Sequence, residues 1–121
     1  MAERGRIYRW PRNRSFGDTK ARPVLVISPE AAHHASTRRV VVPLSRDPRL
    51  NGHLLGVALD PSPANGLQLR SYAMTWHPTT VDAINLGGPL GRITADQLAD
   101  VLQRISAALD LGMQEPWASG V

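Results

Sequence analysis

The stretch ARPVLVIS, Ala21 to Ser28, constrains how the rest of the chain can fold. Its four consecutive aliphatic residues, Val24–Ile27, are followed by Pro29 and preceded by a polar loop. A short run of branched aliphatic residues between turn signals is typical of a strand that is buried on both faces. We therefore predict a buried strand over 22–28, with Arg22 at its entrance.

The neighbouring segments predict further strands around this one. GRIYRW, over 5–10, alternates in polarity, with Ile7 on one face and Tyr8 and Trp10 on the other. Additional strands are predicted over 40–45 (VVVPLS), 54–59 (LLGVAL) and within 68–76 (QLRSYAMTW). The chain therefore contains about five short strands in succession.

Three segments interrupt this pattern. Pro43 has no N–H to donate to a ladder, so its strand is expected to carry a bulge or to lie at an edge of the sheet. The segment 84–93, INLGGPLGRI, is interpreted as a glycine-rich loop. The segment 29–39 fits either a short helical turn or a polar loop.

One helix is predicted near the C-terminus. Thr94 and Gln97 have the spacing of a capping box, and Gly112 is the expected C-terminal stop. Residues 113–121 are expected to be a loose tail. The apolar positions at helical spacing are Leu98, Val101, Leu102, Ile105, Ala108 and Leu109.

These elements predict a mainly β, α+β fold. No helix is interleaved between the strands, which argues against a parallel sheet. A small antiparallel β-barrel or sheet with the C-terminal helix docked on it is the expected architecture. The chain has 121 residues, so we expect a single domain over 1–121.

The amino-acid composition favours some kinds of function and excludes others. The chain has 14 basic and 10 acidic residues, and Lys20 is the only lysine. Arginine makes forked contacts to phosphate, which makes nucleic acid a candidate partner, although arginine-favouring codon usage gives the same composition. There are no cysteines, so disulfides and thiolate chemistry are excluded. No signal or membrane-spanning segment is evident, and a soluble, cytoplasmic protein is expected.

Neither a metal nor a cofactor is predicted. His33 and His34 are adjacent and belong to no spaced ligand motif. The chain contains no phosphate-binding loop, no dinucleotide fingerprint and no GxSxG nucleophile motif.

Polar residues stand where the predicted strands begin or end. Arg22 precedes one strand, Ser45 ends the next, and Trp76 and His77 follow a third. In an antiparallel sheet such ends can meet at one rim, where arginine neutralises phosphate, histidine transfers protons and indole stacks on a base. Each residue alone also fits ordinary turn chemistry.

The order of these segments resembles the MazF/PemK toxin family from about Gly5 to Gly112. GRIYRW, ARPVLVIS and VVVPLS match the family's opening strands, and LGGPLGRITADQLADVLQRISAALDLG matches its ending. The resemblance implies an SH3-like barrel and a homodimer. It also implies the toxin of a type II toxin–antitoxin system, a metal-independent endoribonuclease that cuts single-stranded RNA and is blocked by a MazE-like antitoxin.

The resemblance also assigns roles to individual residues. The family's arginine before proline falls on Arg22, and its strand-end hydroxyl falls on Ser45. His77 is a candidate for proton transfer. RNA binding is expected of polar residues near the strand ends, namely Arg12, Arg14, Asp18, Lys20, Arg46, Trp76 and Thr79.

Two departures keep other functions open. The loop before Arg22 lacks the family's GSEQGG-like string, and we place HPTT, over 77–80, where the family has a QIRT-like tetrapeptide with an arginine. A CcdB-like inhibitor that binds DNA gyrase, or a degenerate member that acts only by binding, is therefore an alternative.

Overall fold

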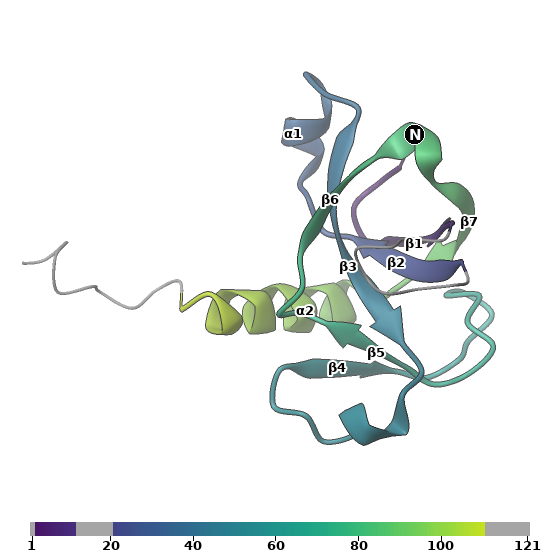
Figure 1. The fold of residues 1–121 in the computed structure, drawn as a ribbon, viewed down its shortest axis with the longest axis vertical. Coiled ribbons are helices and arrows are strands. Elements are labelled where there is room, and N and C mark those ends of the chain that lie inside the picture. The colour runs from purple at the N-terminus through teal and green to yellow at the C-terminus, as the bar shows by residue number, and fades with distance from the viewer. Residues whose placement is uncertain (1, 12–20, 111–121) are drawn as a thin grey trace, which may run out of the picture.

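The computed structural model describes residues 2–11 and 21–110, which form an antiparallel sheet and one long helix (Figure 1). The strands are β1 (Arg6–Trp10), β2 (Arg22–Val26), β3 (Arg38–Ser45), β4 (Gly56–Leu59), β5 (Ser71–Met74), β6 (Thr79–Asp82) and β7 (Gly87–Arg92). The helices are α1 (Glu30–His33) and α2 (Ala95–Ala108), with 3-10 turns η2 (Pro48–Leu50) and η3 (Ala83–Asn85).

The seven strands of the described residues are hydrogen-bonded in the order β4-β5-β3-β2-β1-β7, and β6 pairs with the first half of β3. Every pair is antiparallel, which confirms the predicted α+β class. β4 and β7, at the two ends of this order, do not pair with each other. The sheet therefore stays open rather than closing into the expected barrel.

The central strand β2 is covered on both faces, as its sequence predicts. Leu25 belongs to the larger core, which lies between the sheet and α2. Val24 and Val26 face the opposite way and pack in a second core with Tyr8 and Val81. An unbroken aliphatic run is required at this position because both faces exclude water.

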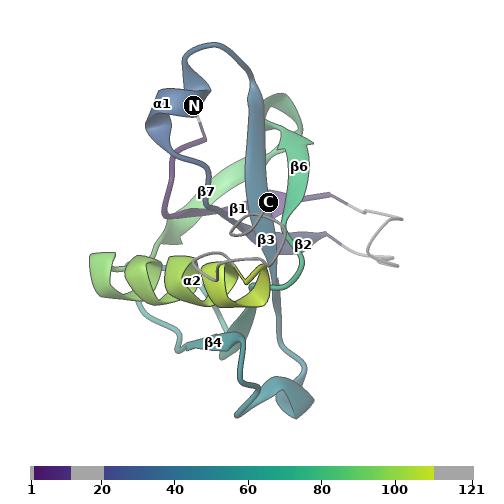
Figure 2. The same ribbon diagram turned by 90° about the vertical axis from the view of Figure 1, so that its left-hand side faces the viewer.

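The predicted C-terminal helix is confirmed as α2, which lies across one face of the sheet (Figure 2). Thr94 and Gln97 form the expected capping box at its N-terminus. Val101 and Ile105 are buried in the larger core, whereas Leu109 is 53% exposed. The predicted stop at Gly112 and the tail over 113–121 lie outside the described residues.

No helix in the described part of the chain has the length and apolar character needed to cross a membrane.

The expectation for Pro43 is wrong, since Pro43 is fully buried in a central strand. The amide of Ile27 donates to Val40, which shows that Val40 and the alternate residues after it bond toward β2. Pro43 therefore faces the other side of β3, where pairing with β6 ends at Val41 and pairing with β5 begins at Leu44. The missing N–H falls at this change of partner, where the ladder has no bond to lose.

Two strands were not predicted. The segment 84–93 was expected to be a loop, but β7 within it pairs with β1. Thr79 and Thr80 were placed after the end of a strand, but they begin β6. Both segments have few apolar side chains, so no period-2 pattern is visible, and their pairing rests on backbone hydrogen bonds.

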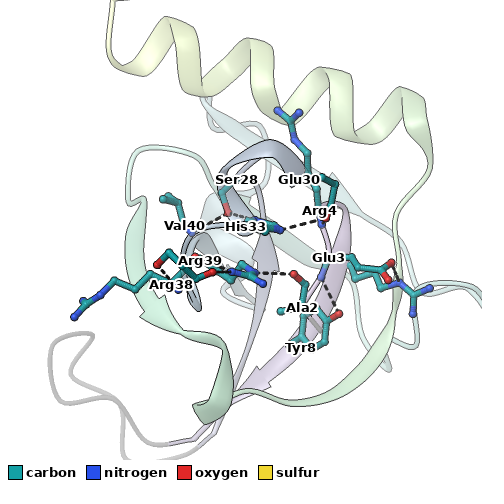
Figure 3. A network of polar contacts seen from close by, with 12 residues as sticks. Ala2, Glu3, Arg4, Tyr8, Ser28, Glu30, His33, Arg38, Arg39 and Val40 are labelled. Atoms are coloured by element: carbon teal, nitrogen blue, oxygen red, sulfur yellow. Dashed lines mark hydrogen bonds and ion pairs between the residues drawn. The ribbon is translucent and has the colours of Figure 1, made fainter.

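A polar network ties the N-terminal segment to α1 and β3, at the end of the molecule away from β4 (Figures 1 and 3). The Glu30 carboxylate accepts from the Arg4 amide at 2.8 Å and lies 3.3 Å from His33 Nδ1. His33 Nε2 is 2.7 Å from Ser28 Oγ. The buried guanidinium of Arg39 donates to the Ala2 carbonyl oxygen at 2.8 Å.

Candidate functional site

Strand pairing brings the two residues expected to act on phosphate, Arg22 and Ser45, to one face of the sheet. Val24 lies opposite Pro43 in the β2–β3 ladder. Arg22 precedes Val24 by two residues, and Ser45 follows Pro43 by two. Because side chains alternate between faces, Arg22 and Ser45 point to the same side of the sheet. This side is the face of the second core, opposite α2.

Arg22 is the first residue of β2 and lies opposite Trp10 in β1. Its side chain is half-buried, and Nη1 is 3.9 Å from the sulfur of Met74. Met74 is the last residue of β5. The start of β2 therefore places the guanidinium beside the end of β5.

Ser45 ends β3 and lies opposite Tyr72 of β5. Its Oγ accepts a hydrogen bond from the Asp47 amide at 3.2 Å. A serine hydroxyl that accepts from a backbone N–H keeps its own hydrogen for another acceptor. Ser45 is thus able to donate to an oxygen above this face.

Arg70 lies on the same face and was not among the predicted site residues. Its guanidinium carbon is 5.7 Å from the centroid of the Tyr72 ring, and Nη1 is 2.7 Å from the Asp60 carboxylate. The Tyr72 side chain, and then Asp60, raise the pKa of Arg70 above its usual range. The sequence contains a pattern that could have identified Arg70. Residues Gln68–Ser71 are an amide, an aliphatic residue, an arginine and a hydroxyl residue, which is the order found in QIRT.

Trp76 is held in a stacked pair with His53, another residue that sequence reasoning missed. The ring centroids are 4.4 Å apart and the planes differ by 24°. His53 occupies the space above Gly56. The Cβ of His53 lies 3.4 Å from the point where a β-carbon would stand if residue 56 had one. Gly56 pairs with Met74, so the stack borders the same face as Arg22.

His77 and Thr79 lie in and after the turn that leaves β5. The His77 amide donates to the Met74 carbonyl oxygen at 3.0 Å, and the Thr79 hydroxyl donates to the His77 carbonyl oxygen at 3.4 Å. Thr79 then pairs with Val41 in the β3–β6 ladder. Both residues are therefore close in the chain to Met74, which contacts Arg22.

The remaining predicted residues are less informative. Arg46 is exposed in the segment after β3. The predictions for Arg12, Arg14, Asp18 and Lys20 fall outside the described residues.

The face thus combines two guanidinium groups, a hydroxyl group and a neighbouring histidine. Such a set suits a phosphodiester, because guanidinium groups offset phosphate charge and a hydroxyl can donate to a nonbridging oxygen. Over residues 2–11 and 21–110, no group of three or more histidine, aspartate or glutamate side chains is placed to hold a metal ion.

Solved structures of toxins and endoribonucleases have the same fold as this chain. Mycobacterium tuberculosis toxin MazF-mt6 is 27% identical, covers 89% of this chain and 99% of its own, and superposes with a TM-score of 0.72. A mycobacterial endoribonuclease solved with its cognate antitoxin is 23% identical over 93% of this chain and 96% of its own, with a TM-score of 0.71. MazF in a MazE–MazF structure from Deinococcus radiodurans is 23% identical over the same shares, with a TM-score of 0.69.

The search of curated proteins finds no match. The family model for the PemK-like, MazF-like toxin of type II toxin–antitoxin systems matches residues 3–109, which includes every strand and both helices. The chain therefore belongs to the PemK-like, MazF-like toxin family of type II toxin–antitoxin systems.

Proposed function

We propose that this toxin is an endoribonuclease that cuts single-stranded RNA in the cytoplasm without a metal ion. The observation that carries the proposal is the placement of Arg22 and Ser45 on one face by the β2–β3 register. Family membership supports the class, and the two residues supply the chemistry that RNA cleavage needs.

In the proposed reaction the ribose 2′-oxygen attacks the adjacent phosphorus. The bond from phosphorus to the 5′-oxygen of the next nucleotide breaks, which leaves a 2′,3′-cyclic phosphate and a free 5′-hydroxyl. One proton leaves the 2′-hydroxyl and one is delivered to the 5′-oxygen. No water or metal ion is consumed in this step.

Each residue has a separate role. Arg22 offsets the negative charge that builds on the phosphate oxygens, since a guanidinium group is a strong hydrogen-bond donor and a poor proton acceptor. Ser45 donates its free hydrogen to a nonbridging oxygen. His77 takes the proton from the 2′-hydroxyl, because histidine is the ready acid–base group at neutral pH.

Two protein partners belong to the proposal. Membership in a type II toxin–antitoxin family supports a cognate MazE-like antitoxin that covers the RNA-binding face. We also propose that the chain works as a homodimer, as the resemblance to the family implies.

The test is to incubate the purified protein with a long single-stranded RNA in EDTA and to map the new ends. Cuts at one short motif, with cyclic phosphate and 5′-hydroxyl ends, are expected. The Arg22→Ala variant should make none of these cuts. The control is Arg38→Ala, which should still make them, because Arg38 is exposed and lies at the opposite end of β3 from Ser45. Folded protein that cuts nothing with or without Mg²⁺ would favour gyrase inhibition or binding alone.

A further inference from the structure

A cavity of about 460 Å³ opens beside the candidate site, at the edge strand β4. On the face that Arg22 occupies, β4 presents only Gly56 and Ala58, the residues opposite Met74 and Tyr72. Neither carries a bulky side chain, so no large side chain of β4 projects from the sheet on this face. His53 lies over Gly56 and Arg70 lies over Tyr72, one on each side of this part of β4.

His53 lines the cavity and Trp76 does not. Trp76 covers one face of the imidazole, which leaves the other face for a second ring. A flat ring that entered the cavity would extend the Trp76–His53 stack by one layer. The imidazole is also fixed in orientation, because its Nδ1 accepts from the Leu55 amide at 3.1 Å. In the neutral ring the proton is then on Nε2, which is a donor.

Asn51 and the ion pair between Asp100 and Arg104 of α2, in which Arg104 Nε is 3.0 Å from Asp100 Oδ1, complete the lining of the cavity. The Asn51 side chain lines it and makes no hydrogen bond with another described residue, so both its donor and its acceptor are available. Arg104 donates to the Leu54 carbonyl oxygen, which ties the loop that carries Asn51 and His53 to α2. The loop is thus held in place as one wall.

Arg70 is paired with Asp60, but this pair does not block an anion. The side chains of Arg70 and Asp60 are 46% and 72% exposed. Exposed ion pairs contribute little stability, because water already solvates both charges. A phosphate can therefore share or replace the carboxylate at modest cost.

We propose that this cavity is a nucleotide subsite of the toxin, which holds one unpaired base of the RNA next to the cleaved bond. The base stacks on His53, its edge bonds to Asn51, and its phosphate lies against Arg70. This inference rests on the proposed ribonuclease function and adds a specificity-determining pair, Asn51 and His53, to it.

The test uses RNA in which the nucleotides around the wild-type cleavage motif are randomised. His53→Ala and Asn51→Ala should relax the preference at one and the same position by about tenfold, within the range for base stacking. Arg70→Gln should weaken all sequences alike and reduce the salt dependence of binding.

The control is Arg49→Ala. Arg49 lies in the same loop, its side chain is 88% exposed and it does not line the cavity, so its loss should change neither the motif nor the rate. The proposal is overturned if His53→Ala and Asn51→Ala keep the full motif, or if they slow every sequence equally.

A second measurement does not depend on cutting. Mixed-sequence hexanucleotides with 2′-O-methyl groups, which cannot react, are added while the NMR signals of the His53 ring and the Asn51 side-chain amide are followed. Shifts of both signals support the subsite even if no cleavage is found. Binding that leaves both signals unmoved, or no binding at all, overturns it. Failure of cleavage alone counts only against the ribonuclease.

Discussion

Gly91 of β7 and Ala64 of the 62–66 loop are in backbone contact, because the Ala64 carbonyl oxygen occupies the place where a β-carbon on Gly91 would stand. The same oxygen accepts from the Arg92 amide at 2.8 Å. This contact holds the loop over the edge strand β7, so the residue at 91 must be glycine.

Gly91→Ala should therefore destabilise the protein by about 2 kcal/mol, within the range for overpacked positions. The loop cannot retreat without losing the hydrogen bond to Arg92. Gly87→Ala is the matched control in the same strand, since its nearest non-neighbouring atom is 3.7 Å away. Denaturant unfolding of both variants measures the difference, and equal midpoints would contradict the contact.

Arg22→Ala should reduce RNA cleavage by about 100-fold or more, as expected for the loss of a charge that stabilises a transition state. The fold should persist, because Arg22 is half-buried at a strand end rather than part of either core. Arg22→Lys should recover only part of the rate, since lysine lacks the forked donors. Single-turnover rates beside circular dichroism spectra measure both effects.

His77→Gln should change the pH dependence of cleavage more than the affinity for RNA. A glutamine keeps hydrogen bonding but cannot take a proton, so the limb of the rate profile that reports the base should disappear. The measurement is the single-turnover rate between pH 5 and 9. An unaltered profile would return His77 to a structural role in the turn after β5.

Glu30→Gln should destabilise the protein at neutral pH and make little difference in acid. The hydrogen bond from the Arg4 amide is the main cause that lowers the pKa of Glu30 below its usual 4.5, and His33 adds to it. A carboxyl with a lowered folded pKa stabilises above its unfolded pKa, and this contribution is lost as pH falls through the folded value. Urea midpoints at pH 7 and pH 3 should differ between the proteins only at pH 7.

Thr94→Ala should cost about 1 kcal/mol, because it removes one half of the capping box at the start of α2. Cleavage should be unaffected, since α2 covers the face of the sheet opposite Arg22. Thermal unfolding and a cleavage assay of the same sample test both statements. A variant that loses activity while stable would show that α2 shapes the site.

The parts of the fold that sequence predicts are those with a repeating side-chain pattern. The run Val24–Ile27 is aliphatic throughout, and α2 has both a capping box and apolar residues at helical spacing. β6 and β7 have neither pattern. They are strands because a neighbouring backbone offers hydrogen bonds, and a partner's backbone leaves no trace in the local sequence.

The candidate site divides in the same way. Arg22 and Ser45 stand at the ends of predicted strands, so residue type and position were enough to nominate them. His53 lies in a loop, and only its stack on Trp76 and its close approach to Gly56 mark it. Arg70 is not among the predicted site residues, although Gln68–Ser71 has the residue order of QIRT, because the sequence comparison places HPTT at that segment.

The buried strand, the capped helix and the α+β class can be predicted without a structure, because they follow from local patterns of apolar and capping residues. Three features are visible only in the folded chain: the sheet stays open, Pro43 lies where β3 changes partner, and His53 and Arg70 border one cavity. These features depend on contacts between residues far apart in the chain, which no local pattern records.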